Sequence, residues 1–386
     1  MKKLTALILA LVMCFALAAC GGSSASSTPA ESAEEPVAEA PAAEAPEAEE
    51  PAAEEPAAAD TAIDPLEIKF STTYSELETG GVILHHFIDK LAELSDGAIT
   101  VNVAWGGTLF DTMGELDALM DGVVDMIMFS HMPHLDTVPL MSFPGFAPGG
   151  SQAALDYFDY ILFDNPETAS LIGAEAESLG IKYLNVTAGG ANAMCAVYPF
   201  DSLDSLAAGS TTFGNADAAI WEALGMNVSA IFPPDVYQAL DTGLINGTSM
   251  ALAPMTAMAW YEVAPYWALD GTYAAGNMFS VNLDWWDGLT DAQRECIQAA
   301  ADDVEDFSAT LYDDSIAEDI ATIENATGNK FAELSDEDLA YFWSLVFEAK
   351  ADDAIARAKT HDCLDDMVVI LEKAAEVTGY DWSYEG

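Results

Sequence analysis

The sequence has few basic residues. Lysine and arginine number 11 against 65 aspartates and glutamates, and the formal charge is −54. A surface this acidic repels nucleic-acid phosphates and anionic lipid headgroups, so nucleic acid is excluded as a partner and so is membrane binding through basic patches. The only arginines are Arg294 and Arg357. Few side chains are therefore available to bind a carboxylate bidentately.

Cysteine pairs and catalytic motifs are also missing. After residue 61 the cysteines are Cys195, Cys296 and Cys363, an odd number without C-x-x-C spacing, so no disulfide framework is indicated. The sequence contains no G-x-S-x-G, H-E-x-x-H, Walker A or G-x-G-x-x-G motif. These absences argue against an enzyme, and we expect no cofactor and no metal. A secreted enzyme with His131 and His134 as metal ligands is the alternative that their spacing leaves open.

The first residues are typical of a secreted lipoprotein. Lys2 and Lys3 precede an apolar run that is too short for a lasting membrane span, which predicts a signal peptide at 1–19. The run ends in Leu-Ala-Ala-Cys, which resembles a bacterial lipobox, so we expect Cys20 to be acylated and to anchor the chain to a membrane. The alternative is an ordinary signal peptide with an incidental cysteine.

Residues 20–61 are predicted to be a tether. From residue 28 onward they are almost entirely alanine, glutamate and proline, with prolines at every fifth position from 36 to 56. This composition cannot form a packed core, because proline interrupts helices and strands and the glutamates repel one another. An extended spacer of this kind reaches on the order of 100 Å. We expect a domain held on the outer face of the cytoplasmic membrane, on the periplasmic side where an outer membrane exists.

The full sequence is 51% hydrophobic, which is enough for a core, and after residue 61 it alternates predicted strands and helices. Strands at 66–71, 99–104 and 124–129 are separated by helices at 82–94 and 111–120, which indicates a parallel sheet covered by helices. A second block starts near Ile181. We expect it to contain strands at 181–186, 193–198, 210–214, 227–231 and 245–251 and helices near 216–224, 234–241 and 255–262.

The last hundred residues are predicted to be helical. A pattern at 290–326 is far longer than the mean helix of about 12 residues, and further helices are expected near 335–359 and 363–379. So long a helix in an α/β protein suggests a strut that crosses between two lobes.

The order of these features resembles the substrate-binding proteins of tripartite ATP-independent periplasmic (TRAP) transporters, of the C4-dicarboxylate-binding type. The resemblance covers roughly residues 64–320. Its most specific part is residues 234–247, PDVYQALDTGLING, which is close to the family pattern E-x-Y-x-A-L-Q-x-G-x-x-D-G. Weaker matches are DGAI at 96–99, GTLF at 107–110 and DGVVDM at 121–126.

The resemblance implies an α/β protein of the two-lobed periplasmic-binding-protein (Venus-flytrap) fold. It also implies a hinge, a helix spanning both lobes, a small organic solute held between them and membrane permease subunits as partners. We expect lobe I to comprise 62–190 plus about 280–318, and lobe II about 191–279 plus 319–386. A binding protein of another transporter class and a sensory ectodomain remain alternatives.

One position departs from the family. Carboxylate-binding members carry an arginine at the end of the strand pattern D-L-x-G-x-K-[IVL]-R, and this sequence has Phe213 there. A second basic position falls near Asn192 and a polar one at Met250. The nearest cations are then expected to be Lys69 and Lys182, inside or at the start of strands and away from the carboxyl ends of these strands.

We therefore expect a solute that is not held by the usual arginine clamp, since a buried carboxylate without a partner is costly. A neutral, hydroxylated or aromatic solute fits better. Aromatic rings expected to stack on it are Trp105, Phe213 and Phe232, and the alternative for each is a purely structural place in the hydrophobic core. Other expected binding residues are Thr73, Asp111, Ser130, His131, Asn192, Asn215, Met250 and Asn277. Two alternatives remain: a Ca²⁺ ion that bridges to an anionic solute, and cation-π selection of a cation.

Overall fold

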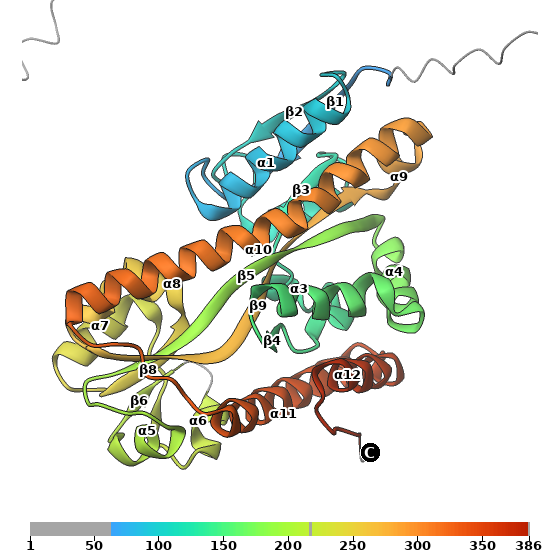
Figure 1. Cartoon of the computed structure of the whole chain (residues 1–386). Helices are drawn as coiled ribbons and strands as arrows, with labels where there is room; N and C mark the ends of the chain where they lie inside the picture. The colour runs from blue at the N-terminus through green and yellow to red at the C-terminus, as the bar shows by residue number, and fades with distance from the viewer. Residues whose placement is uncertain (1–62, 216–217, 385–386) are drawn as a thin grey trace, which may run out of the picture. The chain divides into compact units, whose positions relative to one another are not determined.

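The computed structural model describes residues 63–215 and 218–384 (Figure 1). The signal peptide, the tether and Cys20 lie outside the described residues and stay predictions. Within the described part of the chain, no helix is both long enough and apolar enough to cross a membrane.

The elements are as follows. The N-terminal half contains β1 (Leu66–Ser71), α1 (Thr79–Leu94), β2 (Ile99–Ala104), α2 (Thr112–Met120), β3 (Met126–Phe129), η1 (Met132–His134), η2 (Pro139–Ser142), β4 (Phe146–Pro148), α3 (Ser151–Asp159), η3 (Tyr160–Asp164), α4 (Pro166–Ser178) and β5 (Ile181–Ala196). The C-terminal half contains α5 (Leu203–Gly209), β6 (Phe213–Gly214), α6 (Ala218–Ala223), β7 (Val228–Ser229), α7 (Pro233–Asp241), β8 (Gly247–Ala251), α8 (Leu252–Ala257), η4 (Trp260–Glu262), β9 (Tyr266–Asn282), α9 (Leu283–Asp287), α10 (Asp291–Thr327), α11 (Asp336–Thr360) and α12 (Leu364–Thr378).

The first block has the expected parallel arrangement. Strand β1 pairs in parallel with β2 on one side and β3 on the other. Helix α1 buries Leu84, Phe87 and Leu91, which recur at helical spacing, against this sheet. Helix α2 begins where the sequence predicts it, because the Asp111 carboxylate accepts a hydrogen bond from the Gly114 N–H at 2.9 Å.

Two long antiparallel strands join the blocks into one mixed sheet. The strand order is β2-β1-β3-β9-β5-β8-β6-β7, and β4 adds to β9. The prediction of two separate strands at 181–186 and 193–198 is wrong, since β5 is continuous over 16 residues, with four register shifts against β9. Strand β9, of 17 residues, was not predicted. At Gly276 the two strands are so close that a Cβ atom would lie 2.3 Å from the Ala188 carbonyl oxygen.

The second block is smaller. Strands β6, β7 and β8 pair in parallel, with β6 in the centre, and β8 pairs antiparallel with β5. Helices α7 and α8 pack their buried residues with β8 and β9 around Trp260 and Trp267. The predicted strands at 210–214, 227–231 and 245–251 are present but shorter.

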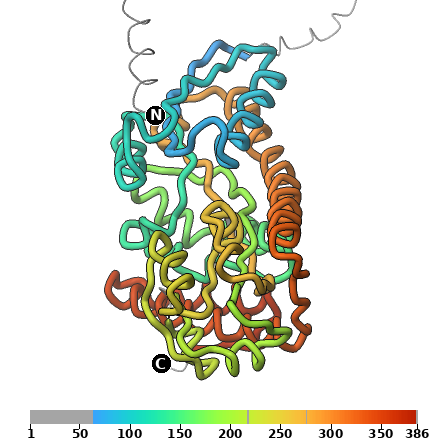
Figure 2. Tube along the Cα trace, turned by 90° about the vertical axis from the view of Figure 1, so that its left-hand side faces the viewer, coloured from blue at the N-terminus to red at the C-terminus, as the bar shows by residue number. Residues whose placement is uncertain are grey.

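Helix α10 is the predicted strut. It spans 37 residues, from a capping box between Thr290 and Gln293 to Gly328, whose φ of 73° ends the helix. It packs on α1 in the first block, along β5, and on α8 in the second. Figures 1 and 2 show it in orange along one side, running from the blue N-terminal block toward the yellow-green block. The Ala188 N–H donates to the Ser308 hydroxyl at 2.8 Å and ties the helix to the middle of β5.

The two C-terminal helices, both predicted, form a further layer. Helix α12 packs on α3 and α4, and α11 packs on α12, η2, α6 and β9. Helix α11 therefore touches elements of both blocks. Its side chains, among them Phe342 and Phe347, belong to the largest hydrophobic cluster of the described residues.

Candidate functional site

A cavity of about 330 Å³ lies where the two blocks meet. The sheet contributes residues of β5, β8 and β9 to it. Asn215, directly after β6, and α6 contribute from the second block, and η1 and β4 from the first, while α11 forms a further wall. The residues that line it are Met132, Phe146, Asn192, Asn215, Ile220, Trp221, Ser249, Met250, Ala251, Asp270, Thr272, Ala274, Phe342, Val346 and Lys350. Ligands of α/β sheets bind beyond the carboxyl ends of the strands, and β6 and β8 both end at this cavity.

Three of the predicted site residues are brought together here. Asn192, Asn215 and Met250 all line the cavity. The Asn192 side-chain amide donates to the Thr272 hydroxyl at 2.9 Å, and the Asn215 amide donates to the Ser249 carbonyl at 2.9 Å. Both amides are thus oriented by the strands beside them.

Asp270 is a buried acid in this cavity that the sequence did not single out. Its side chain lies on β9, and the residue is 3% exposed. Its Oδ1 accepts from the Thr272 N–H at 2.9 Å and from the Thr272 hydroxyl at 2.7 Å. Burial raises the pKa of Asp270 to about 6, against the effect of these two bonds. The two hydrogen bonds from Thr272 hold the carboxyl group in one orientation.

Phe213 does not line the cavity. It is fully buried, and its ring packs against the Trp221 indole with centroids 4.4 Å apart. A Cβ atom at Gly247 would lie 2.9 Å from the Phe213 ring, so the ring also fills the space above that glycine. The aromatic surface that faces the cavity at this point belongs to Trp221.

Lys350, on α11, was also missed. The expectation that Lys69 and Lys182 are the nearest cations is wrong, because Lys350 lines the cavity and they do not. The helix that carries it was predicted. Lys350 was missed for two reasons. The resemblance to the family stops near residue 320, and the spacing of apolar residues along a helix does not show which strands the helix faces.

The other predicted site residues lie elsewhere. Thr73 and Ser130 follow β1 and β3, and Trp105 stacks on His85 with ring centroids 4.9 Å apart. Asn277 is buried and donates to the Tyr74 hydroxyl at 2.9 Å. Asp111 caps α2, and Phe232 is 66% exposed before α7.

His131 and His134 do not form a metal pair in the described structure. His134 Nε2 lies 2.9 Å from the Thr112 carbonyl oxygen. Burial, with a smaller effect from His134, lowers the pKa of His131 to about 4, so this imidazole is neutral. The described residues contain no group of three or more histidines, cysteines or acids placed to hold a metal ion.

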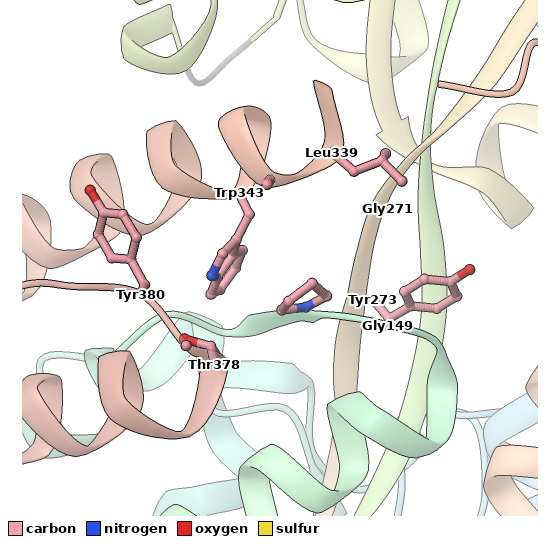
Figure 3. Close-up of a pocket in the computed structure, with 10 residues that line it drawn as sticks. Gly149, Gly271, Tyr273, Leu339, Trp343, Thr378 and Tyr380 are labelled. Carbon is pink, nitrogen blue, oxygen red and sulfur yellow. The ribbon is translucent and has the colours of Figure 1, made fainter. Parts of the chain in front are cut away.

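A second cavity, of about 440 Å³, lies beside the first. Asp270, Thr272 and Ala274 of β9 line the first cavity, whereas Gly271 and Tyr273 line the second, as the alternation of side chains along a strand requires. Figure 3 shows the Trp343 indole projecting from α11 into it, with Tyr380 and Thr378 nearby. It is formed mainly by the C-terminal helices and by none of the predicted site residues.

The chain is similar to known proteins over most of its length. The family described as bacterial extracellular solute-binding protein, family 7, matches residues 70–349. The C4-dicarboxylate-binding periplasmic protein of Rhodobacter capsulatus is 24% identical over 294 residues, which is 72% of this chain and 83% of that protein. A solute-binding protein of Chromohalobacter salexigens is 23% identical over 67% of this chain and 76% of its own length.

Solved structures agree in fold. A TRAP periplasmic solute-binding protein from Ochrobactrum anthropi has a TM-score of 0.66 at 22% identity and covers 81% of this chain and 97% of its own. One from Sulfitobacter, with bound β-D-galacturonate, has a TM-score of 0.59 at 18% identity and covers 80% of this chain and 99% of its own. The predicted two-lobed periplasmic-binding-protein fold is confirmed.

Proposed function

Because the chain belongs to the family of bacterial extracellular solute-binding proteins, family 7, we propose that it captures a small organic solute between its lobes and delivers it to a TRAP-type membrane permease. The family is one of transport proteins and not of enzymes. The relatives' own ligands, a C4-dicarboxylate in one case and a galacturonate in another, support a small polar solute.

The observation that carries this proposal is the position of the 330 Å³ cavity. Its walls come from both blocks, and those blocks are connected by β5, β9 and the continuous helix α10. Bending of a few connecting segments changes the distance between such walls, which is how hinged binding proteins enclose and release a ligand.

The solute is proposed to bind without the arginine clamp of carboxylate-binding relatives. Phe213 stands at the position of that arginine, and its ring is buried under Trp221. Trp221, on α6, therefore offers an aromatic wall to a solute, next to the amides of Asn192 and Asn215. The proposal includes acylation of Cys20 and a tether that holds the domain outside the cytoplasmic membrane.

A thermal-unfolding screen tests the binding step. The purified protein is heated with sugars, polyols, amino compounds, aromatic compounds and mono- and dicarboxylates, each with and without Ca²⁺. A true ligand at 100 times its Kd raises the free energy of unfolding by about 2.7 kcal/mol. Failure of every solute class to raise the unfolding temperature would contradict the proposal.

The delivery step needs a separate measurement. Uptake of the ligand into vesicles that contain the TRAP permease subunits is expected to depend on this protein. Binding without such uptake would instead favour a binding protein of another transporter class or a sensory ectodomain.

A further inference from the structure

The cavity between the two blocks holds a buried acid without a counter-ion. Asp270 is 3% exposed, and it is the one acid among the described residues that line the cavity. Within the described chain, no lysine, arginine or histidine forms an ion pair with it. We propose that the cleft selects a small organic amine, whose ammonium group binds the Asp270 carboxylate. This inference rests on the proposed function and names the chemical class of its solute.

One oxygen of this carboxyl group is used by the protein, and the other is open to the cavity. Thr272 donates twice to Oδ1. No described residue donates to Oδ2, yet Oδ2 is not among the unpartnered side-chain atoms that are closed off from solvent in the described structure. Because Asp270 lines the cavity, Oδ2 is the oxygen that a solute can reach. Burial raises the pKa of Asp270, and an ammonium group at Oδ2 would lower it again by pairing with the charged form.

A second acceptor is oriented by the same hydrogen bonds. The Thr272 hydroxyl donates its proton to Asp270, so it can only accept from the Asn192 amide, whose nitrogen lies 2.9 Å away. The Asn192 amide oxygen is therefore turned away from Thr272, and no described residue donates to it. Both open oxygens are acceptors, so this side of the cavity favours a solute rich in donors. An ammonium group has three donors and no acceptor, whereas a carboxylate has acceptors alone.

Aromatic side chains form much of the remaining wall. Phe146, Trp221 and Phe342 all line the cavity. Trp221 and Phe342 are buried and contact one another, with ring centroids 5.3 Å apart, so they form a continuous aromatic surface. The face of an aromatic ring attracts a cation, and the attraction is stronger where water is excluded. The same surface suits the carbon skeleton of an organic amine, which a bare metal ion does not have.

This arrangement disfavours other classes of solute. A carboxylate brings a second negative charge into a cavity that already holds Asp270, which is unfavourable at low dielectric. Lys350 also lines the cavity, but it already has an interaction within the protein and is given no part in binding. An uncharged sugar can donate to the open oxygens, but it leaves the buried acid without a counter-ion.

Isothermal titration calorimetry on the purified protein tests this. The amine probes are ethanolamine, isopentylamine and phenethylamine, and each is compared with its N-acetyl derivative and with the alcohol in which a hydroxyl group replaces the amino group. Succinate, D-galacturonate and D-glucose represent the other classes. We expect an amine to bind most tightly, and its two uncharged counterparts to bind at least about tenfold more weakly, since both lack the positive charge. This series needs no substitution, so it remains informative if a variant is unstable.

One substitution then assigns the charge. Asp270→Asn keeps the shape of the side chain and an oxygen that can accept from Thr272, but it removes the negative charge. We expect it to weaken binding of the amine at least about tenfold and to leave binding of the matching alcohol nearly unchanged, so that most of the discrimination between the two is lost. Asp381→Asn is the matched control, since Asp381 is exposed, and it should leave this ratio of affinities unchanged.

The outcomes separate the inference from the proposed function. Tighter binding of succinate, galacturonate, glucose or an alcohol than of every amine overturns the inference and leaves the proposed function standing. An unchanged ratio of affinities in Asp270→Asn also overturns it. If no amine binds but another solute class raises the unfolding temperature in the thermal screen, the inference alone fails. If no solute of any class binds, both the inference and the proposed function fail.

Discussion

Glu305 is expected to make the protein less stable as the pH rises. It lies on α10 where this helix packs on α3, near the carboxyl group of Asp159. Burial, together with the charges of Asp159, Asp302, Asp306 and Asp164, raises the pKa of Glu305 to about 8. Among the described residues, neither Glu305 nor Asp159 forms an ion pair with a cation.

The sign follows from proton linkage. In the unfolded chain Glu305 titrates near its ordinary pKa of 4.5, and in the folded chain near 8. Between these values the folded state holds a proton that the unfolded state has released, so the free energy of unfolding falls as the pH rises through this window. The full difference between these two pKa values would correspond to about 5 kcal/mol. Because Glu305 is partly exposed to solvent, which screens the charges, we expect about 1–2 kcal/mol.

Urea unfolding of the wild type and of Glu305→Gln at pH 4 and pH 8.5 measures this, since pH 4 lies below the unfolded pKa and pH 8.5 above the folded one. The substitution should have little effect at pH 4 and should stabilise the protein by about 1–2 kcal/mol at pH 8.5. Glu295→Gln, an exposed position on the same helix, is the control and should not change the pH dependence. Equal effects of Glu305→Gln at both pH values, or destabilisation at pH 8.5, would refute the reasoning.

Three further predictions concern the close approach of β5 and β9, the aromatic residues and the N-terminus. Gly276→Ala should lower the free energy of unfolding, measured in urea, by about 2–3 kcal/mol, because the new Cβ would lie 2.3 Å from the Ala188 carbonyl oxygen. Gly190→Ala, in the paired strand, should lower it much less, because the atom nearest to that Cβ is 3.8 Å away. Phe213→Ala should lower the free energy of unfolding by about 3–5 kcal/mol and Phe232→Ala by under about 0.5 kcal/mol, because the Phe213 ring is fully buried and Phe232 is 66% exposed. Equal losses of stability in the two variants would contradict the described packing. Cys20→Ser should move the protein from the detergent phase to the aqueous phase in a Triton X-114 partition, and an unchanged distribution would argue against acylation.

The long helices could be predicted from local sequence. The ends of α10 are determined by Thr290 and Gln293 at one side and by Gly328 at the other, all of which act within a few residues. Strand β9 has no such signal. It contains Asp270, Gly271, Gly276 and Asn277, residue types that are typical of turns, and it is stabilised by pairing with β5, about 80 residues away. Gly189 and Gly190 likewise suggest a turn within β5, where the structure has register shifts in a continuous strand.

The same limit explains which site residues were found. Asn192, Asn215 and Met250 lie within residues 64–320, the part of the chain that the resemblance covers, and they line the cavity. Asp270 was missed because its strand was missed. Lys350 was missed because a helix at 336–360 reveals its own periodicity and not the strands against which it packs.

The charge of the cleft therefore depends on an element outside the part of the chain that resembles the family most. At the end of β6 an arginine would have to displace the packing of Phe213 on Trp221 and beside Gly247. Helix α11 meets the cavity from another side, where Lys350 requires no such displacement. Helix α11 also packs on α6 of the second block and on η2 of the first. The distance between Lys350 and Asp270 therefore depends on the relative position of the two blocks. Helix α11 thus both lines the cleft and contacts elements of the two blocks.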